Sequence, residues 1–384
     1  MVEAVRSGCS QRSVSREFGV SLRTVQRWLD RAEGKPLDLV DWSDRPDSPH
    51  VVANRTALDV EEQIVALRNE LRTESDLGEY GADAIHRQMQ DRGFAHVPCE
   101  RTINRILERK GTFDGRRRIR HAPPPLGWYL PDVAGANAEL DQFDVISGLV
   151  IEGGTDVEVL TAISLHGALP GSWPQMAISA KFVSQAMLEH WSAFGCPAYA
   201  QFDNDTRFQG AHQHPDTMGR ISRLCMSLGV VPVFTPPRET GFQAAIEGLN
   251  NRWQQKVWHR LHHESLESLC VRSERYIAAA RRKKAFRQEG APLRHPLPKD
   301  WRFDVQARPQ GKIIYLRRTD DEGRAHMLGR VFKVQEHWVH RLVRAEVDLD
   351  QSKISFYSLR RREPAQQILL SETPYQLPDR RFRG

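Results

Sequence analysis

The sequence predicts a multidomain protein with two helical units at the N-terminus, a central α/β domain and a small β-barrel at the C-terminus. Three observations give this order. Helical periodicity interrupted by a glycine occurs twice before residue 112. β-branched and apolar stretches take over after the prolines at 123–125. Short alternating segments then fill residues 311–371. The length of 384 residues agrees with two to four domains.

The charge is unevenly distributed along the chain. The net charge is +6, but residues 136–265 carry a net charge of −5, whereas residues 266–310 and 311–384 carry +6 and +5. A protein that only coats a polyanion would not be expected to have an acidic centre. The distribution fits a chain that contacts nucleic acid through its flanks and binds metal in its middle.

Several classes of protein are excluded at this stage. There is no apolar run long enough for a membrane span or a signal peptide. The five cysteines are scattered and form no C-x-x-C pair, so neither a zinc ribbon nor a disulfide framework is indicated. We therefore expect a cytoplasmic protein without membrane association. No P-loop motif is present, so the chain itself should not hydrolyse ATP.

The first helical unit covers residues 1–40. Its apolar positions have helical spacing on both sides of Gly19, and Ser21 is a candidate N-cap for the second helix. This pattern is typical of a helix-turn-helix, whose second helix enters the major groove of DNA. The side chains expected to face DNA are Arg23, Thr24, Gln26 and Arg27. A helical hairpin with a solvated basic face is the simpler alternative.

A second helix-turn-helix, of the winged kind, is predicted over residues 55–122. Helical segments at 59–72, 81–92 and 98–109 precede a basic arm that leads into the proline run. The arm would bind phosphates, and the prolines would form a stiff linker. The alternative is that these helices and those of the first unit form one bundle of five or six helices. The predicted DNA-facing residues are Arg101, Thr102, Asn104, Arg105, Arg116, Arg117 and Arg118.

The central domain is predicted over residues 136–290. Residues 139–150 and 156–165 read as a β-hairpin, 177–194 as an amphipathic helix, 229–235 as a further strand, and the chain from about 242 as a helix. Strands with helices packed on them indicate an α/β sandwich.

Three acids have distinctive places in this pattern. Asp144 lies inside the first strand, Asp203 follows a strand, and Glu247 lies in the helix after the last strand. A carboxylate within an apolar strand is costly unless it binds something. Converging carboxylates suit Mg²⁺, and two such ions can assist phosphoryl displacement. Each acid alone would more often be a surface group, and the prediction depends on all three occurring in order.

These residues resemble the catalytic core of DDE transposases and retroviral-type integrases, including bacterial insertion-sequence transposases. The segments that carry the resemblance are Asp141-Gln142-Phe143-Asp144, Phe202-Asp203-Asn204-Asp205, and Glu247-Gly248-Leu249-Asn250 after a Pro-rich turn. The resemblance implies an RNase H-like fold for the central domain. The sequence differs from the family pattern in three ways. The interval from Asp203 to Glu247 is long, and Asp205 stands where glycine is usual. Asp141 and Asp144 are also alternatives for the first ligand position.

The resemblance also implies an activity, cofactors and partners. Asp144, Asp203 and Glu247 would be catalytic and would bind two Mg²⁺ or Mn²⁺ ions. The reaction would be cleavage at the 3′ end of an element followed by strand transfer. The partners would be double-stranded DNA at element ends and target, and further copies of the chain in a dimer or tetramer. A separate ATPase that selects the target is left open. The expected location is the bacterial nucleoid.

Two other functions compete with this one. A domesticated, inactive core would leave a sequence-specific DNA-binding regulator. An RNase H-like nuclease acting on hybrids or junctions is disfavoured, because such an enzyme needs little base readout.

Residues 308–372 are predicted to form the C-terminal barrel. Five short alternating segments are separated by polar turns. They resemble the SH3-like C-terminal barrel of integrases and several transposases, and their net charge of +5 suits contact with the DNA backbone or with another copy of the chain.

Overall fold

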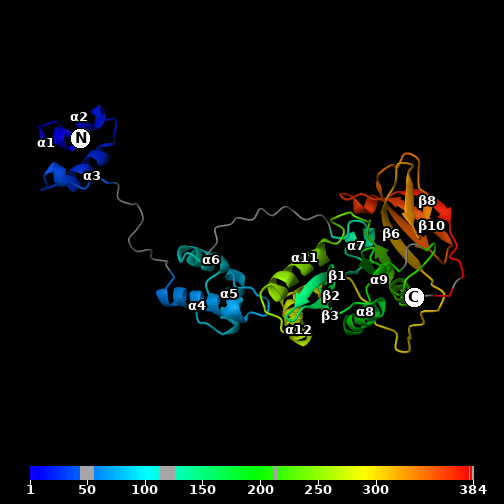
Figure 1. Cartoon of the computed structure of the whole chain (residues 1–384). Helices are drawn as coiled ribbons and strands as arrows, with labels where there is room; N and C mark the ends of the chain where they lie inside the picture. Colours follow the sequence, from blue (N-terminus) through cyan, green and yellow to red (C-terminus); the bar gives the residue numbers. More distant parts are fainter. Residues whose placement is uncertain (44–55, 113–125, 211–213, 380, 383–384) are drawn as a thin grey trace. The chain divides into compact units, whose positions relative to one another are not determined.

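The computed structural model describes residues 1–43, 56–112, 126–210, 214–379 and 381–382. The chain forms two compact units, Met1–Ala57 and Leu58–Gly384, and each is described by itself. Figure 1 shows the elements of both units with their labels. Among the described residues, no helix has the length and apolar character needed to cross a membrane.

The first unit contains three helices in the region where a helix-turn-helix is predicted. Its helices are α1 (Val2–Arg6), α2 (Gln11–Glu17) and α3 (Leu22–Ala32). The hydroxyl of Ser21 accepts the backbone N–H of Thr24 at 3.1 Å, which caps α3 as predicted. Gly19 has a φ of +63°, a conformation that glycine adopts easily, and it turns the chain between the helices. The apolar core is small, and α1 was not predicted.

The second unit begins with three helices, α4 (Leu58–Glu74), α5 (Ala82–Asp91) and α6 (Glu100–Arg109). Ile64, Ile85, Met89, Ile103 and Leu107 are fully buried between them. The predicted helices are therefore present. The predicted basic arm lies in residues 113–125, outside the described part of the chain, as do Arg116, Arg117 and Arg118.

A central sheet follows these helices. The described residues place nine strands in it, in the order β11-β10-β9-β6-β5-β4-β1-β2-β3. The long hairpin of β1 and β2 agrees closely with the predicted strands. The strand β3 was not predicted, because Pro170 and Pro174 lie within it. It forms because it lies at the edge of the sheet, where prolines are tolerated. The bounds are β1 (Leu140–Ile151), β2 (Thr155–Ser164), β3 (Pro170–Gln175), β4 (Tyr199–Phe202), β5 (Val231–Phe234) and β6 (Lys312–Arg318).

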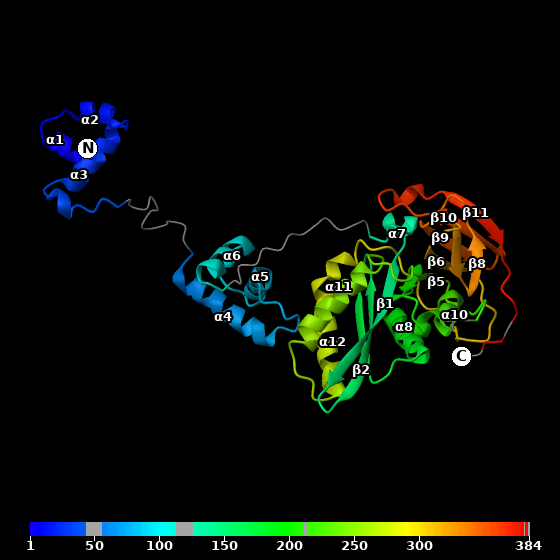
Figure 2. The ribbon, with the colours of Figure 1, turned by 45° about the horizontal axis from the view of Figure 1, so that its top comes forward.

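Helices cover both faces of the sheet near the hairpin, as Figure 2 shows. On one face Phe143 and Phe202 pack with Trp191 in a large buried cluster. On the other face Ile246, Trp253 and Leu269 pack against residues of β1 and β2. This is the α/β layering that the sequence predicts. The helices are α7 (Pro131–Ala134), α8 (Ala180–Phe194), α9 (Thr206–Gln209), α10 (Arg220–Ser227), α11 (Ala244–Trp253), a π-helical turn η2 (Gln254–Trp258) and α12 (Leu266–Lys283).

The C-terminal strands extend the central sheet. β6 lies parallel to β5, with Val233 beside Ile314 and Phe234 beside Tyr315. The predicted separate SH3-like barrel is therefore not confirmed, because Ile313 and Tyr315 bury their side chains in the same cluster as Phe234. The remaining strands are β7 (Arg324–Met327), β8 (Arg330–Lys333), β9 (Leu342–Asp348), β10 (Lys353–Ser358) and β11 (Leu369–Pro374), of which β7 and β8 form their own two-stranded sheet.

Candidate active site

The carboxyl ends of β4 and β5 lie beside the first half of β1 and the middle of β6. β1 and β4 are parallel, with Gln142 beside Gln201. If this register continues by two residues, Asp144 lies beside Asp203, and neighbouring strands are only about 4.8 Å apart. Strand alternation also puts each aspartate on the same face as the glutamine two residues before it. The fold thus brings the first two predicted acids together.

Asp144 is partly buried and held by two donors. Its own neighbour Val145 donates a backbone N–H to Oδ1 at 2.9 Å, and Asn250 Nδ2 donates to Oδ2 at 2.7 Å. Burial, together with the nearby carboxylate of Asp203, raises the pKa of Asp144 to about 6, although these two hydrogen bonds act in the opposite direction. The negative charge on Asp144 is therefore poorly compensated within the protein.

Asp203 has a similar environment. Burial raises the pKa of its carboxyl, and Asp205 adds to this, although the backbone N–H of Asp205 donates to Asp203 Oδ1 at 3.0 Å. Asp205 itself caps the short helix α9 and forms an ion pair with Arg207 at 2.7 Å. Asp205 thus has a structural role in the turn after β4.

Glu247 lies on α11, one helical turn before Asn250, so both side chains face the same direction. Its charge contributes weakly to the raised pKa of Asp144. Glu247 is nonetheless exposed, and the described residues contain no group of three or more Asp, Glu, His or Cys side chains close enough to hold a metal ion. The structure brings Asp144 and Asp203 together but leaves the third acid at a distance from them.

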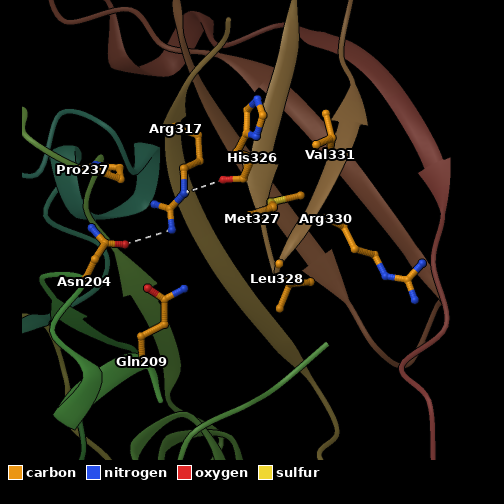
Figure 3. A pocket seen from close by; sticks show the side chains of 10 residues that line it. Asn204, Gln209, Pro237, Arg317, His326, Met327, Leu328, Arg330 and Val331 are labelled. Carbon is orange, nitrogen blue, oxygen red and sulfur yellow. Dashed lines mark hydrogen bonds between the residues drawn. The ribbon is translucent and has the colours of Figure 1, made fainter. Parts of the chain in front are cut away.

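Basic residues of β6 reach the same part of the sheet. Continuing the parallel register from Phe234 beside Tyr315 places Arg317 beside the turn after β5. Its guanidinium donates to Asn204 Oδ1 at 3.0 Å and to Thr235 O at 2.9 Å. Figure 3 shows Arg317 next to Asn204, the residue that follows Asp203. Sequence analysis missed Arg317, because it assigned this strand to a separate barrel.

Asp141, the rival of Asp144, is used within the fold. It is fully buried, and Arg294 donates to both carboxylate oxygens at 2.8 and 2.7 Å. Trp191 Nε1 donates to Oδ2 at 2.9 Å. Burial alone would lower the pKa of Arg294, but the facing carboxylate raises it above its usual value. Asp141 faces the side of the sheet opposite to Asp144 and is paired with Arg294, so the geometry favours Asp144 over Asp141 as the candidate for the first acid.

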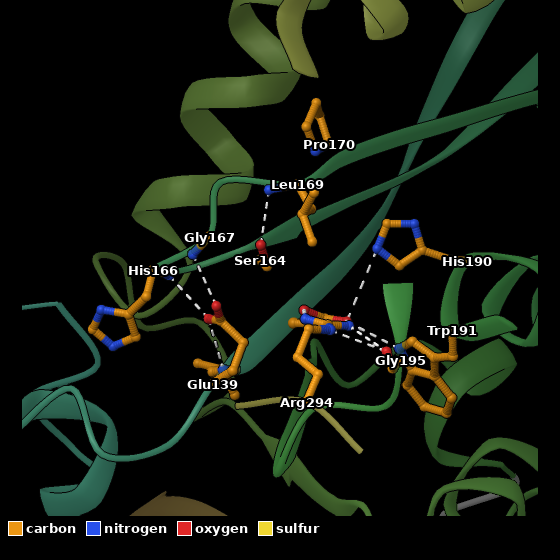
Figure 4. Close-up of polar contacts among 12 residues, drawn as sticks. Glu139, Ser164, His166, Gly167, Leu169, Pro170, His190, Trp191, Gly195 and Arg294 are labelled. Atoms are coloured by element: carbon orange, nitrogen blue, oxygen red, sulfur yellow. Dashed lines mark hydrogen bonds and ion pairs between the residues drawn. The ribbon is translucent and has the colours of Figure 1, made fainter. Parts of the chain in front are cut away.

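Figure 4 shows the surroundings of that ion pair. Arg294 also donates to the carbonyl oxygen of Gly195, and His190 lies nearby with no hydrogen-bond partner in the described residues. Burial lowers the pKa of His190 to about 4, so its imidazole is neutral at physiological pH.

Glu139, which directly precedes β1, accepts the backbone N–H groups of His166 and Gly167 at 2.9 and 2.8 Å. The buried acids Glu139 and Asp141 are thus compensated inside the protein.

A buried polar network fixes α11 against the two strands. Gln142 Nε2 and the hydroxyl of Tyr129 both donate to Gln201 Oε1, at 2.6 and 2.7 Å. Gln142 Oε1 accepts the backbone N–H of Ile246 at 3.0 Å, and Gln201 Nε2 donates to Phe242 O at 3.2 Å. Sequence analysis missed this role. The one sequence signal for this network was the glutamine that stands two residues before each aspartate, Gln142 before Asp144 and Gln201 before Asp203.

The predicted DNA-facing residues of the helical units are mostly exposed. In the first unit, Arg23, Gln26 and Arg27 are exposed on α3, whereas Thr24 is half-buried and its hydroxyl lies 2.8 Å from that of Ser21. The second unit shows the same pattern on α6. There Arg101, Asn104 and Arg105 are exposed and Thr102 is half-buried.

Comparisons with known proteins give weak likenesses. No protein-family model matches the chain. The catalytic core domain of BIV integrase is 15% identical, with 36% of this chain and 81% of that chain covered and a TM-score of 0.28. The simian T-cell lymphotropic virus intasome in complex with the PP2A regulatory subunit B56 gamma is 11% identical, with 72% of this chain and 88% of that chain covered and a TM-score of 0.31. The catalytic core domain of HTLV-2 integrase in complex with magnesium, in its dimeric form, is 12% identical, with 42% of this chain and 87% of that chain covered and a TM-score of 0.25. Scores of this size establish neither the fold nor the activity of this chain.

Proposed function

We propose that this chain is a DNA transposase or integrase, a polynucleotidyl transferase that cleaves the 3′ ends of an element and transfers them to target DNA. One observation carries the proposal. Asp144 on β1 lies close enough to Asp203, which follows β4, for the two carboxylates to repel each other, and no cation of the described residues pairs with Asp144. Ligand sites of α/β sheets commonly lie beyond the carboxyl ends of the strands.

The donor set at this site fits a hard divalent cation. Mg²⁺ prefers carboxylate oxygens and keeps several waters, so a pair of partly buried aspartates suffices to anchor it. Asp144 and Asp203 would hold Mg²⁺ or Mn²⁺, and Glu247 on α11 is the third ligand that the proposal assigns. Bound there, two ions would polarise the phosphate and stabilise the departing oxygen. Asn250 and the network around Gln142 would keep Asp144 and α11 in place.

The helical units would supply recognition of double-stranded DNA. Arg23, Gln26 and Arg27 on α3 combine side chains that pair with guanine and adenine edges, and Arg101 and Asn104 on α6 do the same. Two such modules on one chain would read a longer site than either alone. Because two DNA ends must be joined to one target, we expect a dimer or tetramer at work, located at the bacterial nucleoid. The need for a partner ATPase stays open.

The test uses the whole chain and the DNA that flanks its gene. The expected result is a nick at a defined 3′ end in Mg²⁺ or Mn²⁺, none in EDTA, and joining of that end to a second DNA. Asp203→Asn should abolish both steps while DNA binding is retained. The exposed Asp156 on β2 provides a matched control, and Asp156→Asn should react like the wild type. Full strand transfer by Asp203→Asn would refute the assignment.

One observation favours a second function, a DNA-binding regulator with an inactive core. Glu247 is exposed, and the described residues gather no three-acid group. In that case the flanking DNA would be bound with sequence preference and would stay intact in every divalent metal tested. A metal-dependent nick that Asp144→Asn removes would exclude this alternative.

A further inference from the structure

A pocket of about 430 Å³ lies between the chain that follows β4 and the β7–β8 hairpin. Figure 3 shows its lining at close range. Its lining combines the apolar side chains of Pro237, Met327 and Leu328 with polar side chains, and Figure 3 shows Pro237 on the opposite side of Arg317 from Met327 and Leu328. The volume lies in the range of pockets that hold small ligands. Since Asn204 lines the pocket and directly follows Asp203, the pocket adjoins the proposed catalytic site.

The side chain of Gln209 gives the pocket an unused polar group. The residue is only 8% exposed, and its amide forms no hydrogen bond with any described residue. Figure 3 shows that amide directed toward Arg317 across the pocket. The amide atoms are not enclosed by the described residues, so water reaches them, and a ligand in the pocket can replace that water with hydrogen bonds of its own.

The charge around the pocket selects the class of ligand. Arg317 uses four hydrogen bonds, to His326 O, Thr235 O, Leu316 O and Asn204 Oδ1, and a guanidinium has five N–H donors. One donor is therefore spare. Arg330 is exposed at the rim, where its guanidinium pairs with the buried carboxylate of Asp216 at 2.6 Å, and the described residues that line the pocket include no acid. The pocket suits a ligand with a flat, polar-edged ring and a negative charge outside.

We propose that this pocket receives one unpaired nucleotide of a DNA strand, next to the phosphate that lies at Asp144 and Asp203. This inference rests on the proposed function and names a further part of its substrate. The base would lie against Pro237 and Leu328, and its edge would pair with the amide of Gln209, since glutamine matches the donor and acceptor pattern of a base. Arg330 would lie beside the strand's backbone. Enzymes that do chemistry on a base take it out of the stack and read its edge by hydrogen bonds in a pocket, and the proposed site would hold an unpaired base in the same manner.

The experiment compares two DNA duplexes that differ in one position, one fully paired and one with a single unpaired thymidine. Binding is measured by fluorescence anisotropy with the full chain, in EDTA and at one fixed salt concentration, because affinity for DNA depends strongly on salt. The wild type should prefer the unpaired DNA by about tenfold, the size expected for one enclosed base. Gln209→Leu should bring the preference close to one. Gln306→Leu, the same change at an exposed position outside the pocket, should keep it.

A second measurement covers the case in which Gln209→Leu does not fold. In wild-type protein, 5-iodouracil at the unpaired position is cross-linked by light, and the attached peptide is mapped by mass spectrometry. Attachment within residues 204–209 or 326–331 supports the pocket. Attachment only elsewhere, or an unchanged preference in a folded Gln209→Leu protein, overturns it. If free thymidine monophosphate displaces the unpaired duplex as effectively as a competing unpaired duplex does, the pocket is a site for free nucleotides and the proposal for a DNA strand is also overturned.

These outcomes are independent of the proposed function. Binding and cross-linking are measured without metal, so an absent nick would refute the transferase and leave the pocket result intact. Conversely, a normal metal-dependent nick together with loss of the predicted cross-link would refute only the pocket.

Discussion

Asp141 and Asp144 lie on the same strand and face opposite sides of the sheet. Asp141 is fully buried and is neutralised by a bidentate contact from Arg294. Asp144 is partly buried and has a second carboxylate beside it, so its pKa is raised to about 6, first by burial and then by Asp203. One acid therefore serves the fold, whereas no cation of the described residues pairs with the other. The contrast gives a physical criterion for separating structural from functional carboxylates.

The largest expected effect comes from breaking the internal pair. Asp141→Asn should lower the free energy of unfolding by about 3–5 kcal/mol, because it leaves the guanidinium of Arg294 buried without a counter-ion. Urea unfolding followed by circular dichroism measures the change. A loss of less than about 1 kcal/mol would show that the buried pair contributes far less than this comparison requires.

Asp144→Asn should have the opposite effect on stability. In EDTA at pH 8 it should stabilise the protein by about 1–2 kcal/mol, because each unit of pKa shift corresponds to about 1.4 kcal/mol and Asp144 is partly exposed. The same variant should be inactive in strand transfer. A destabilised Asp144→Asn protein would contradict the idea that Asp144 lacks internal compensation.

The pH dependence sharpens the same point. The pKa of Asp144 in the folded protein is raised from its usual 3.8 to about 6. Its contribution to stability is therefore fully present below about pH 3.8 and is lost as the pH rises through 6. The stability difference between Asp144→Asn and wild type should grow over that interval. A difference that is flat between pH 4 and pH 7, measured by urea unfolding in EDTA, would contradict the raised pKa.

A smaller effect is expected from the network that positions α11. Tyr129→Phe removes a buried hydroxyl that lies 2.7 Å from Gln201 Oε1 and 3.0 Å from Phe242 O. The expected loss of stability is about 1 kcal/mol, with a loss of strand-transfer rate that exceeds any change in DNA affinity. Tyr357→Phe on β10 is the matched control. If Tyr129→Phe and Tyr357→Phe lowered stability and strand-transfer rate equally, the claim that this network positions α11 would be contradicted.

Much of the architecture could be predicted from the sequence, because its elements have clear local signals. The β1–β2 hairpin, α8 and the capped helix α3 were predicted within a few residues, since their periodicity and caps are local. The strand β3 could not be found, because its prolines argue against a strand unless its edge position is known. The parallel pairing of β6 with β5 joins segments far apart in the chain, and nothing local distinguishes it from a strand of a separate barrel.

The site was predicted in part. The choice between Asp141 and Asp144 rested on the register of Gln142 with the family motif, and the structure supplies the physical reason in the arginine that occupies Asp141. Arg294 lies between the predicted central domain, which ends at residue 290, and the predicted barrel, which begins at residue 308, so its contact with Asp141 could not be foreseen. The roles of Gln201, Tyr129 and Arg317 depend on long-range contacts. The exposure of Glu247 was not predicted either, and it is the feature that most separates the two proposed functions.

The central claim is that Asp144 and Asp203 together bind a divalent cation, whereas Asp141 does not. Binding of Mn²⁺ measured by electron paramagnetic resonance tests this directly, without DNA and without turnover. The account predicts saturable binding to the wild type and to Asp156→Asn, and at least a tenfold weaker binding, or about 1.4 kcal/mol, to Asp144→Asn and Asp203→Asn. Unchanged Mn²⁺ affinity in folded Asp144→Asn and Asp203→Asn proteins would contradict it.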